Sequence, residues 1–312
     1  MRSKPTPSSP QPKSVERPGQ KPWTVRSVLQ WTADFFAQHD LSSARLDAEI
    51  LLAHVLEQDR LALYLRYEEP VPEAALATYR GLIRRRVNRE PISYITGMRE
   101  FYTISFAVDP SVLIPRHETE HLVEYAVQYA EAHHGPTEHG SLKIFEIGTG
   151  CGNLCIALAK HLPQAQIVSM DISSSAISIA NQNLRGQPDC CERILFFQGD
   201  LLEGLHPERA KFHLIVSNPP YVPAESWNDL PPEIRDYEPR IALDGGRRGM
   251  EILDRILRDA AKYLLPGGTL VVEIGEDQAE VLLGKANDTG HYRQSEILED
   301  YAGKPRVLVA TT

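Results

Sequence analysis

The sequence predicts an α/β fold, with a mostly parallel β-sheet and a small helical bundle ahead of it. From residue 142 onward, short apolar and β-branched runs alternate with amphipathic stretches. This alternation is typical of strands and helices that build a parallel sheet with helices on both faces. Between residues 23 and 89 the apolar residues instead recur at the three-to-four-residue spacing of helices.

The elements of the α/β part are expected where apolar runs are bounded by turn-forming residues. Strands are expected at 143–147, 166–171, 194–198, 213–217 and 269–274. Helices are expected between most of these strands, at 152–162, 173–184 and 249–264. Two late segments, 294–298 and 306–310, are expected to complete the sheet as an antiparallel pair.

The first 22 residues differ in composition from the rest of the chain. Prolines are mixed there with serine, glutamine and basic residues. Because such a stretch cannot bury enough apolar surface to fold, we expect a disordered tail at 1–22. A transit peptide is the alternative, since Glu16 is the only acidic residue in the tail. The prolines oppose the amphipathic helix that transit peptides form.

The remaining chain changes character twice. Residues 23–90 are expected to form the helical domain. A β-branched and aromatic run at 101–108, preceded by Gly97, predicts a β-hairpin within a linker at 91–115. Residues 116–312 are then expected to form the α/β domain.

Four arginines lie close together at the end of the helical domain, at positions 84, 85, 86 and 89. A solvated helix face explains them, and contact with a large anionic partner is the alternative. The net charge of the whole chain is −9. This charge disfavours stable binding to nucleic acid, because phosphate contacts need a local excess of Lys and Arg.

The cysteines and the apolar runs indicate the cellular compartment in which the chain folds. The cysteines Cys151, Cys155, Cys190 and Cys191 form no CxxC pair, so we expect reduced thiols in a cytoplasmic setting, without a disulfide or a metal site. No apolar run approaches the roughly 20 residues that span a bilayer, and no membrane association is expected.

A glycine-rich loop, Gly148-Thr149-Gly150-Cys151-Gly152, follows the first expected strand. Glycines allow a sharp turn and the close approach of a ligand, and open α/β sheets bind ligands at the carboxyl ends of their strands. The dinucleotide pattern G-x-G-x-x-G requires glycine at position 153, where Asn153 stands, so a dehydrogenase is disfavoured. Asp171, which ends the second strand, can cap the next helix or accept hydrogen bonds from both hydroxyls of a ribose. The two features together favour a nucleoside cofactor.

The most specific feature is Asn218-Pro219-Pro220-Tyr221, directly after the strand expected at 213–217. A rigid turn is the simplest explanation, because proline fixes φ and lacks an N–H donor. The motif also presents acceptors in fixed directions. The side-chain oxygen of Asn218 and the carbonyl of Pro219 can both accept hydrogen bonds from one –NH2 group, while Tyr221 stacks on the planar group that bears it.

That arrangement suits a particular chemical problem. The nitrogen of an amide or an exocyclic amine is a poor nucleophile, because its lone pair is delocalised. Holding both N–H bonds aims the lone pair at an electrophilic methyl group and favours the pyramidal nitrogen of the transition state. The sulfonium of S-adenosylmethionine is already activated, so neither a metal nor a general base is required.

Together, these motifs resemble those of the release-factor glutamine methyltransferase family, also called PrmC or HemK. The resemblance extends from about residue 40 to the end. The segments that carry the resemblance are 44–52, 89–97, 99–102, 113–116, 148–152, 218–221, 237–239 and 244–246. The amino-terminal segments narrow the match, since enzymes that methylate adenine or guanine amines share the Asn-Pro-Pro-Tyr motif.

The resemblance implies a fold and an activity. The fold is a Rossmann-like S-adenosylmethionine-dependent methyltransferase sheet with an antiparallel last strand. The activity is methyl transfer from S-adenosylmethionine to the side-chain amide N5 of the glutamine in the Gly-Gly-Gln motif of peptide-chain release factors. The helical domain and the hairpin would dock the release factor, with Phe101 as one contact.

The resemblance also implies cofactor-binding residues. The loop from Gly148 to Gly152 would line the methionine part of the cofactor. Asp171 would bind the ribose, Asp200 and Leu201 would lie beside the adenine, and Asn218 would also border the cofactor.

The Asn-Pro-Pro-Tyr motif would bind the acceptor. Asn218, Pro219, Pro220 and Tyr221 would hold the glutamine amide, with Asn218, Pro219 and Tyr221 as the catalytic residues. Two departures from the family pattern stand out: His117 replaces a usual proline, and Leu201 replaces an aromatic residue of some members.

Two other functions remain as alternatives. One is an amine methyltransferase that acts on adenine or guanine in nucleic acid, which the negative charge and the lack of a basic recognition domain disfavour. The other is a non-catalytic binding protein for release factors or ribosomes, which the intact glycine loop disfavours.

Overall fold

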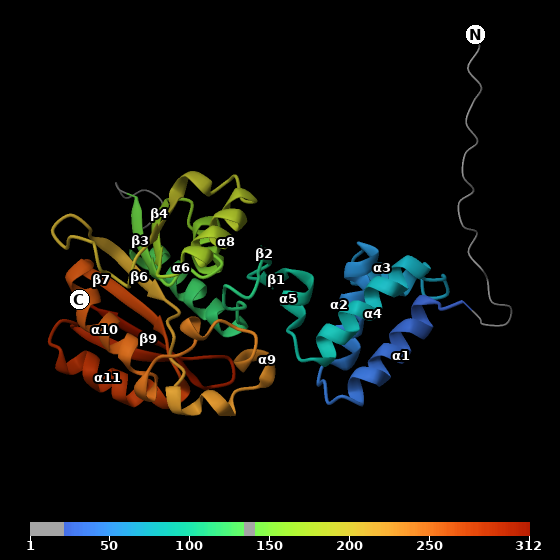
Figure 1. The fold of residues 1–312 in the computed structure, drawn as a ribbon. Coiled ribbons are helices and arrows are strands. Elements are labelled where there is room, and N and C mark those ends of the chain that lie inside the picture. Colours follow the sequence, from blue (N-terminus) through green and yellow to red (C-terminus); the bar gives the residue numbers. More distant parts are fainter. Residues whose placement is uncertain (1–21, 134–140) are drawn as a thin grey trace, which may run out of the picture. The chain divides into compact units, whose positions relative to one another are not determined.

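The structure, a computed structural model, describes residues 22–133 and 141–312. The tail expected at 1–22 lies outside these residues apart from its last position. Internal contacts divide the chain into two compact units, one ending at Val87 and the other spanning Asn88–Thr312. Figure 1 labels the elements of both units.

The first unit is helical. Its helices are α1 (Val25–Ala37), α2 (Ala44–Leu56), α3 (Arg60–Leu65) and α4 (Glu73–Val87). Thr24 starts α1 with a capping box, because its side chain accepts a hydrogen bond from the backbone N–H of Ser27 and the Ser27 hydroxyl accepts one from the backbone N–H of Thr24.

The arginines at the end of the helical unit do not share one environment. Arg86 is 8% exposed, and its Nε donates to Asp47 Oδ2 of α2 at 2.8 Å. Arg84 and Arg85 are exposed, whereas Arg89 belongs to the second unit and lies 3.3 Å from Glu233. The hypotheses of one solvated face and of one contact surface are therefore both wrong for Arg86, which joins α4 to α2.

The second unit is built on a seven-stranded sheet with the order β5-β4-β3-β6-β7-β9-β8. Its strands are β3 (Leu142–Ile147), β4 (Ala165–Asp171), β5 (Ile194–Gln198), β6 (Phe212–Ser217), β7 (Leu264–Glu273), β8 (Gln294–Glu299) and β9 (Pro305–Thr311). Strands β3 to β7 pair in parallel, and β9 is antiparallel to β7 and β8. The expected fold class, including the late antiparallel pair, is confirmed.

Helices connect these strands. They are α5 (Ile92–Thr96), α6 (Glu120–His133), α7 (Asn153–His161), α8 (Ser174–Arg185), α9 (Pro232–Arg235), α10 (Glu251–Ala260) and α11 (Ala279–Asp288). The helices expected at 152–162 and 173–184 are present, the one expected at 249–264 is shorter, and α11 was not expected. In the part of the chain that the structure describes, no helix is long and apolar enough to cross a membrane.

Two apolar cores lie on opposite faces of the sheet, because successive side chains of a strand point to opposite faces. On β3, Ile144 belongs to the core that α6, α7 and α8 share. The next residue, Phe145, belongs to the core that α10 and α11 share. Figure 1 shows α6 and α8 on one side of the sheet and α10 and α11 on the other. Coverage of both faces explains why these strands are nearly continuous apolar runs.

The expected hairpin is present, but its turn falls inside the apolar run. Strand β1 (Met98–Phe101) pairs antiparallel with β2 (Ile104–Ala107). Between them, Tyr102 and Thr103 have φ values of +48° and +64°. Tyrosine and threonine rarely adopt this backbone region, so residue type did not mark the turn. The hairpin belongs to the same compact unit as the sheet.

Asn183 of α8 ties the hairpin and the glycine loop to one helix. Its Oδ1 accepts from the N–H of Ala107 at 2.8 Å, and its Nδ2 donates to the carbonyls of Ala107 at 3.0 Å and Cys151 at 2.9 Å. Asn183 is 8% exposed, so water cannot readily replace these hydrogen bonds. One side chain therefore fixes two segments that are distant in the sequence.

Glu146 of β3 is a carboxyl group buried inside the sheet. It is 1% exposed and lies opposite Ser169 of β4, whose hydroxyl donates to Glu146 Oε2. Burial raises the pKa of Glu146 to about 7, although hydrogen bonds from Ser169 and Cys155 oppose the rise. The group therefore holds a proton in the folded chain at a pH where an ordinary glutamate has lost it.

The first prediction concerns Asn183→Ala. Loss of the side chain leaves buried backbone groups of Ala107 and Cys151 without these partners, which costs about 2–4 kcal/mol. We expect the melting temperature, followed by circular dichroism, to fall by roughly 5–10 °C. Asn181→Ala is the matched control, since the partly exposed Asn181 on the same helix donates only to the carbonyl of Ile177. An equal shift for both variants would contradict this account.

The second prediction concerns Glu146→Gln and pH. The pKa of Glu146 is about 7 in the folded chain and about 4.3 in an unfolded one. Because the folded chain binds this proton more tightly, the group adds to the free energy of unfolding below the unfolded-state pKa. This contribution is lost as pH rises to 7, a change of about 3 kcal/mol. Urea unfolding over this range should show the glutamine variant gaining on wild type by about that amount. Parallel curves for the two proteins would show that Glu146 does not titrate as described.

Candidate active site

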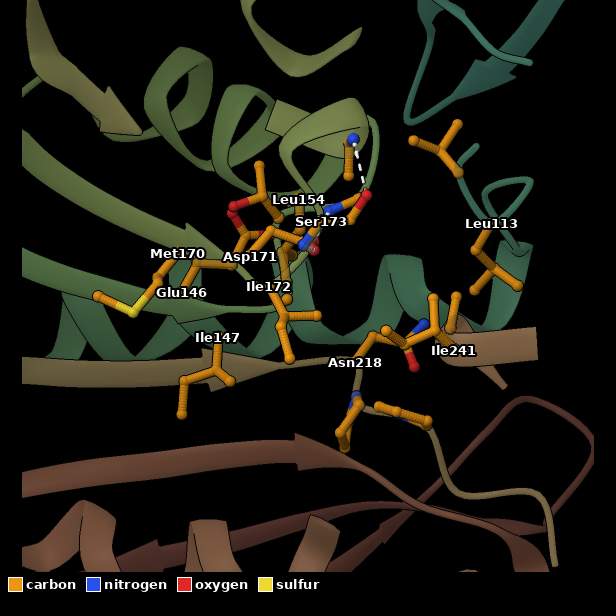
Figure 2. A pocket seen from close by; sticks show the side chains of 18 of the residues that line it. Leu113, Glu146, Ile147, Leu154, Met170, Asp171, Ile172, Ser173, Asn218 and Ile241 are labelled. Atoms are coloured by element: carbon orange, nitrogen blue, oxygen red, sulfur yellow. Dashed lines mark hydrogen bonds between the residues drawn. The ribbon is translucent and has the colours of Figure 1, made fainter. Parts of the chain in front are cut away.

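A cavity opens where the chain order of the parallel strands reverses. Strand β3 lies between β4 and β6, and the segments that follow these strands line the cavity together with the segment after β5. Open α/β sheets bind ligands at this position. Figure 2 shows Asp171, Asn218 and Ile241, which come from three different segments, arranged around the cavity.

The glycine loop contributes only part of its length to the cavity. Gly148, Thr149 and Gly150 are among the described residues that line it, whereas Cys151 and Gly152 are not. Gly152 has φ +82°, and a Cβ there would lie 3.2 Å from the Cβ of Ala180 on α8. Gly152 therefore allows close packing of the loop on a helix, and Cys151 is 1% exposed.

Asp171 ends β4 at the cavity wall and serves two purposes. Its Oδ2 accepts from the N–H of Gly150 at 2.8 Å, and its Oδ1 accepts from the N–H of Ser173 at 2.8 Å. Burial raises the pKa of Asp171, and hydrogen bonds from the backbone N–H groups of Gly150, Ser173 and Ile172 oppose that rise. The carboxylate thus braces the glycine loop and the start of α8, and it lines the cavity where a ligand hydroxyl can reach it.

The segment after β5 combines a charge pair with an apolar wall. Asp200 and Leu201 both line the cavity, and Leu201 has φ +54°. Arg255 of α10 donates to Asp200 Oδ2 at 2.7 Å, which fixes the carboxylate at the rim. Ile241 and Ile172 add apolar surface to the same cavity. A flat, partly polar group such as a nucleobase fits this combination.

The Asn-Pro-Pro-Tyr segment divides into two parts. Asn218, Pro219 and Pro220 are among the described residues that line the cavity, whereas Tyr221 is not. The Tyr221 hydroxyl donates to Glu273 Oε1 at 2.9 Å, and burial beside that carboxylate raises the pKa of the phenol. Tyr221 therefore anchors the segment to β7 in this conformation. The expectation was that its ring stacks on a bound amide.

Phe101 does not lie where a docking contact is expected. It is 1% exposed, and its ring packs edge-on against Phe106 with centroids 6.3 Å apart. The expectation that Phe101 contacts a release factor is therefore wrong for this conformation. Phe101 stands in the apolar run at 101–108, and the sequence of that run does not distinguish a core residue from a residue that contacts a partner.

Two loops over the cavity share one buried acceptor. Glu238 is 5% exposed, and its Oε2 accepts from the N–H of Ile114 at 3.1 Å while its Oε1 accepts from the guanidinium of Arg116. The loop before α6 and the loop after α9 are thereby joined. Each loop sends an apolar side chain, Leu113 and Ile241, to the cavity wall.

Sequence reasoning missed several residues of the cavity. They include Glu146, Thr119, Ile241 and Arg255. The position of Glu146 two residues before Gly148 was the one available signal. Thr119, Ile241 and Arg255 reach the cavity through the tertiary fold alone.

Two family models match the chain. The model described as the PrmC N-terminal domain matches residues 27–97. The model described as the methyltransferase small domain matches residues 134–229. Each match covers one part of the chain.

The chain is also similar to curated proteins over most of its length. A release factor glutamine methyltransferase of Geobacter sulfurreducens is 44% identical, covering 86% of this chain and 90% of the relative. One of Rhodopirellula baltica is 39% identical, covering 94% of this chain and 98% of the relative.

Among solved structures, the hMettl16 catalytic domain in complex with MAT2A 3′UTR hairpin 6 matches with a TM-score of 0.54 and 15% identity, covering 78% of this chain and 94% of that chain. At this identity the likeness shows a shared fold. The two curated relatives carry the assignment further, and the chain belongs to the release factor glutamine methyltransferase family.

Proposed function

We propose that this protein transfers a methyl group from S-adenosylmethionine to the side-chain amide nitrogen of a glutamine in peptide-chain release factors. The curated relatives carry the name of this activity. The observation that carries the proposal within this chain is the orientation of Asn218. Its Nδ2 donates to Thr119 Oγ1 at 2.8 Å, which leaves Oδ1 as the acceptor of the side-chain amide.

The residues of the cavity fit the cofactor. We assign the methionine part to Gly148, Thr149 and Gly150, where backbone and ligand can approach closely. Asp171, a carboxyl group at the end of β4 that lines the cavity, suits the two hydroxyls of a ribose. S-adenosylmethionine supplies a methyl group already activated by the sulfonium.

The adenine is assigned to the opposite part of the cavity. Asp200 offers an acceptor for an exocyclic amine, and Leu201 with Ile172 and Ile241 offers apolar surface for the ring. Cys151 and Gly152 support the loop behind these contacts. Their part in cofactor binding is indirect in this proposal.

The acceptor amide is held by the Asn-Pro-Pro-Tyr segment. Asn218 Oδ1 and the carbonyl of Pro219 accept the two N–H bonds of the glutamine side chain. This contact orients the nitrogen lone pair toward the methyl group and stabilises the positive charge that develops on nitrogen. Pro220 keeps the backbone rigid, and Tyr221 anchors the segment. The proton leaves after methyl transfer, and no general base is assigned.

The domain assignment completes the proposal. Residues 23–90 form the substrate-docking domain, 91–115 the hairpin linker and 116–312 the methyltransferase domain. The first family model, which spans residues 27–97, supports a distinct amino-terminal part. Because release factors act in translation, we expect the reaction in the cytoplasm.

Methylation of nucleic acid gains no support from the comparisons. The RNA hairpin belongs to a structure that shares only the fold with this chain. The net charge of −9 remains unfavourable for contact with phosphates.

The third prediction tests the proposed acceptor site with Asn218→Ala. The protein is incubated with methyl-labelled S-adenosylmethionine and, separately, a release factor, DNA or ribosomal RNA. We expect label in the release factor, a fall in kcat of at least ~100-fold for the variant because a positioning group is lost, and nearly unchanged cofactor affinity by calorimetry. Asn181→Ala is the matched control. Label in nucleic acid but not in release factor would sink the proposed function, and unchanged turnover of the variant would refute the clamp.

A further inference from the structure

A further buried carboxyl group, Glu273, lies next to the acceptor segment. Glu273 is the last residue of β7 and is 0% exposed. Strands β6 and β7 are parallel neighbours, and Ser217 lies opposite Val272. Asn218 follows Ser217 directly after β6, and Glu273 follows Val272 at the end of β7, so the sheet register brings the carboxyl group beside the motif.

Both oxygens of Glu273 accept hydrogen bonds from hydroxyl groups of the site. The hydroxyl of Thr119 donates to Oε2 at 2.7 Å, and the hydroxyl of Tyr221 donates to Oε1 at 2.9 Å. Burial raises the pKa of Glu273, while these two hydrogen bonds and the charge of Arg306 oppose the rise and favour the ionised form. In this geometry each oxygen of Glu273 is the acceptor and each hydroxyl is the donor.

This acceptor sets the direction of the next hydrogen bond. The Thr119 hydroxyl has one proton, which is used toward Glu273, so its oxygen can only accept from Asn218. The Nδ2 group of Asn218 fills that place at 2.8 Å. An amide that points its nitrogen toward Thr119 must present its oxygen on the other side.

We propose that Glu273 is a positioning residue for methyl transfer: through Thr119 it holds the Asn218 amide with its oxygen toward the acceptor –NH2 group, and through Tyr221 it anchors the end of the same segment. The inference rests on the proposed function, in which Asn218 Oδ1 accepts from the glutamine amide. It adds two residues, Glu273 and Thr119, that do not touch the reacting atoms.

The relay has a polarity that a neutral amide would not preserve. A glutamine at position 273 has one acceptor oxygen, so it cannot accept from Thr119 and Tyr221 together. With its nitrogen toward Tyr221, it gives up the anchor of the segment. With its nitrogen toward Thr119, it donates to the threonine hydroxyl, which can then donate to Asn218. The Asn218 amide would turn its oxygen toward Thr119 and its nitrogen toward the substrate, which places two donors against each other. The shape of the site would stay the same, because Glu and Gln have nearly the same size.

The fourth prediction compares Glu273→Gln, Thr119→Val, Thr119→Ser and the double variant Glu273→Gln/Thr119→Val. We expect kcat for release-factor methylation to fall at least ~10-fold in Glu273→Gln and in Thr119→Val, since a positioning group is turned or lost. Thr119→Ser keeps the hydroxyl and should retain most of the activity. KM and the cofactor dissociation constant should stay within about twofold, because the proposed effect falls on the orientation of the acceptor rather than on uniform binding.

The double variant separates positioning from general structure. If Glu273 acts through Thr119, the effect of Glu273→Gln on kcat should shrink in the Thr119→Val background to the effect that Tyr221→Phe has alone. Thr269→Val is the matched control, since Thr269 is also fully buried on β7 but bonds to Thr311. Melting temperatures of all variants show whether each one folds.

The possible outcomes separate a failure of the positioning role from a failure of the proposed function. Wild-type protein that does not methylate release factor would refute the proposed function itself. With active wild type, full kcat in Glu273→Gln, strictly additive losses in the double variant, or equal losses in Thr119→Ser and Thr119→Val would overturn the positioning role.

Discussion

The parallel pairing of β3 with both β4 and β6 is the constraint on which the rest of the site depends. This pairing brings the carboxyl ends of three strands to one edge of the sheet. The glycine loop follows β3, Asp171 ends β4 and Asn218 follows β6, so they meet around one cavity although they are far apart in sequence. The apolar cores on both faces hold the strands in this register, and the chemistry of the site is carried by the loops.

Buried carboxyl groups then fix those loops. Glu146 lies inside the sheet below the glycine loop, Glu238 joins the loops before α6 and after α9, and Glu273 lies beneath the acceptor segment. Glu238 and Glu273 each accept on both oxygens, so each side chain joins two segments. Burial of such a group is costly unless its partners are in place. Because burial without these partners is costly, the loops keep their shape only when the whole unit is folded.

The sequence contained enough information for the sheet and for the main motifs. Strands buried on both faces are continuous apolar runs, and the glycine loop and the Asn-Pro-Pro-Tyr segment directly follow such runs, where open α/β sheets bind ligands. The turn at Tyr102 and Thr103 escaped prediction because its residues carry no turn signal. Helix α3 is only six residues long, which leaves too few positions to show a helical period.

The supporting residues of the site were beyond sequence reasoning for a different reason. Thr119 and Glu273 are 154 positions apart and meet through one hydrogen bond. Neither stands in a motif, and each is an ordinary residue for a helix start or a strand end. Gly152 and Phe101 show the converse: both lie in segments that point to function, yet both are used for packing. A motif identifies the segment, and only the tertiary contacts assign the role of each member.

The central claim is that Asn218 and Pro219 hold the nitrogen that receives the methyl group. A crystal structure of the protein with S-adenosylhomocysteine and a release factor tests it most directly. The account predicts that Asn218 Oδ1 and the Pro219 carbonyl both lie within hydrogen-bond distance of the glutamine side-chain nitrogen, with that nitrogen facing the cofactor sulfur. A glutamine bound with its carbonyl oxygen against Asn218, or held by other residues, would contradict the account.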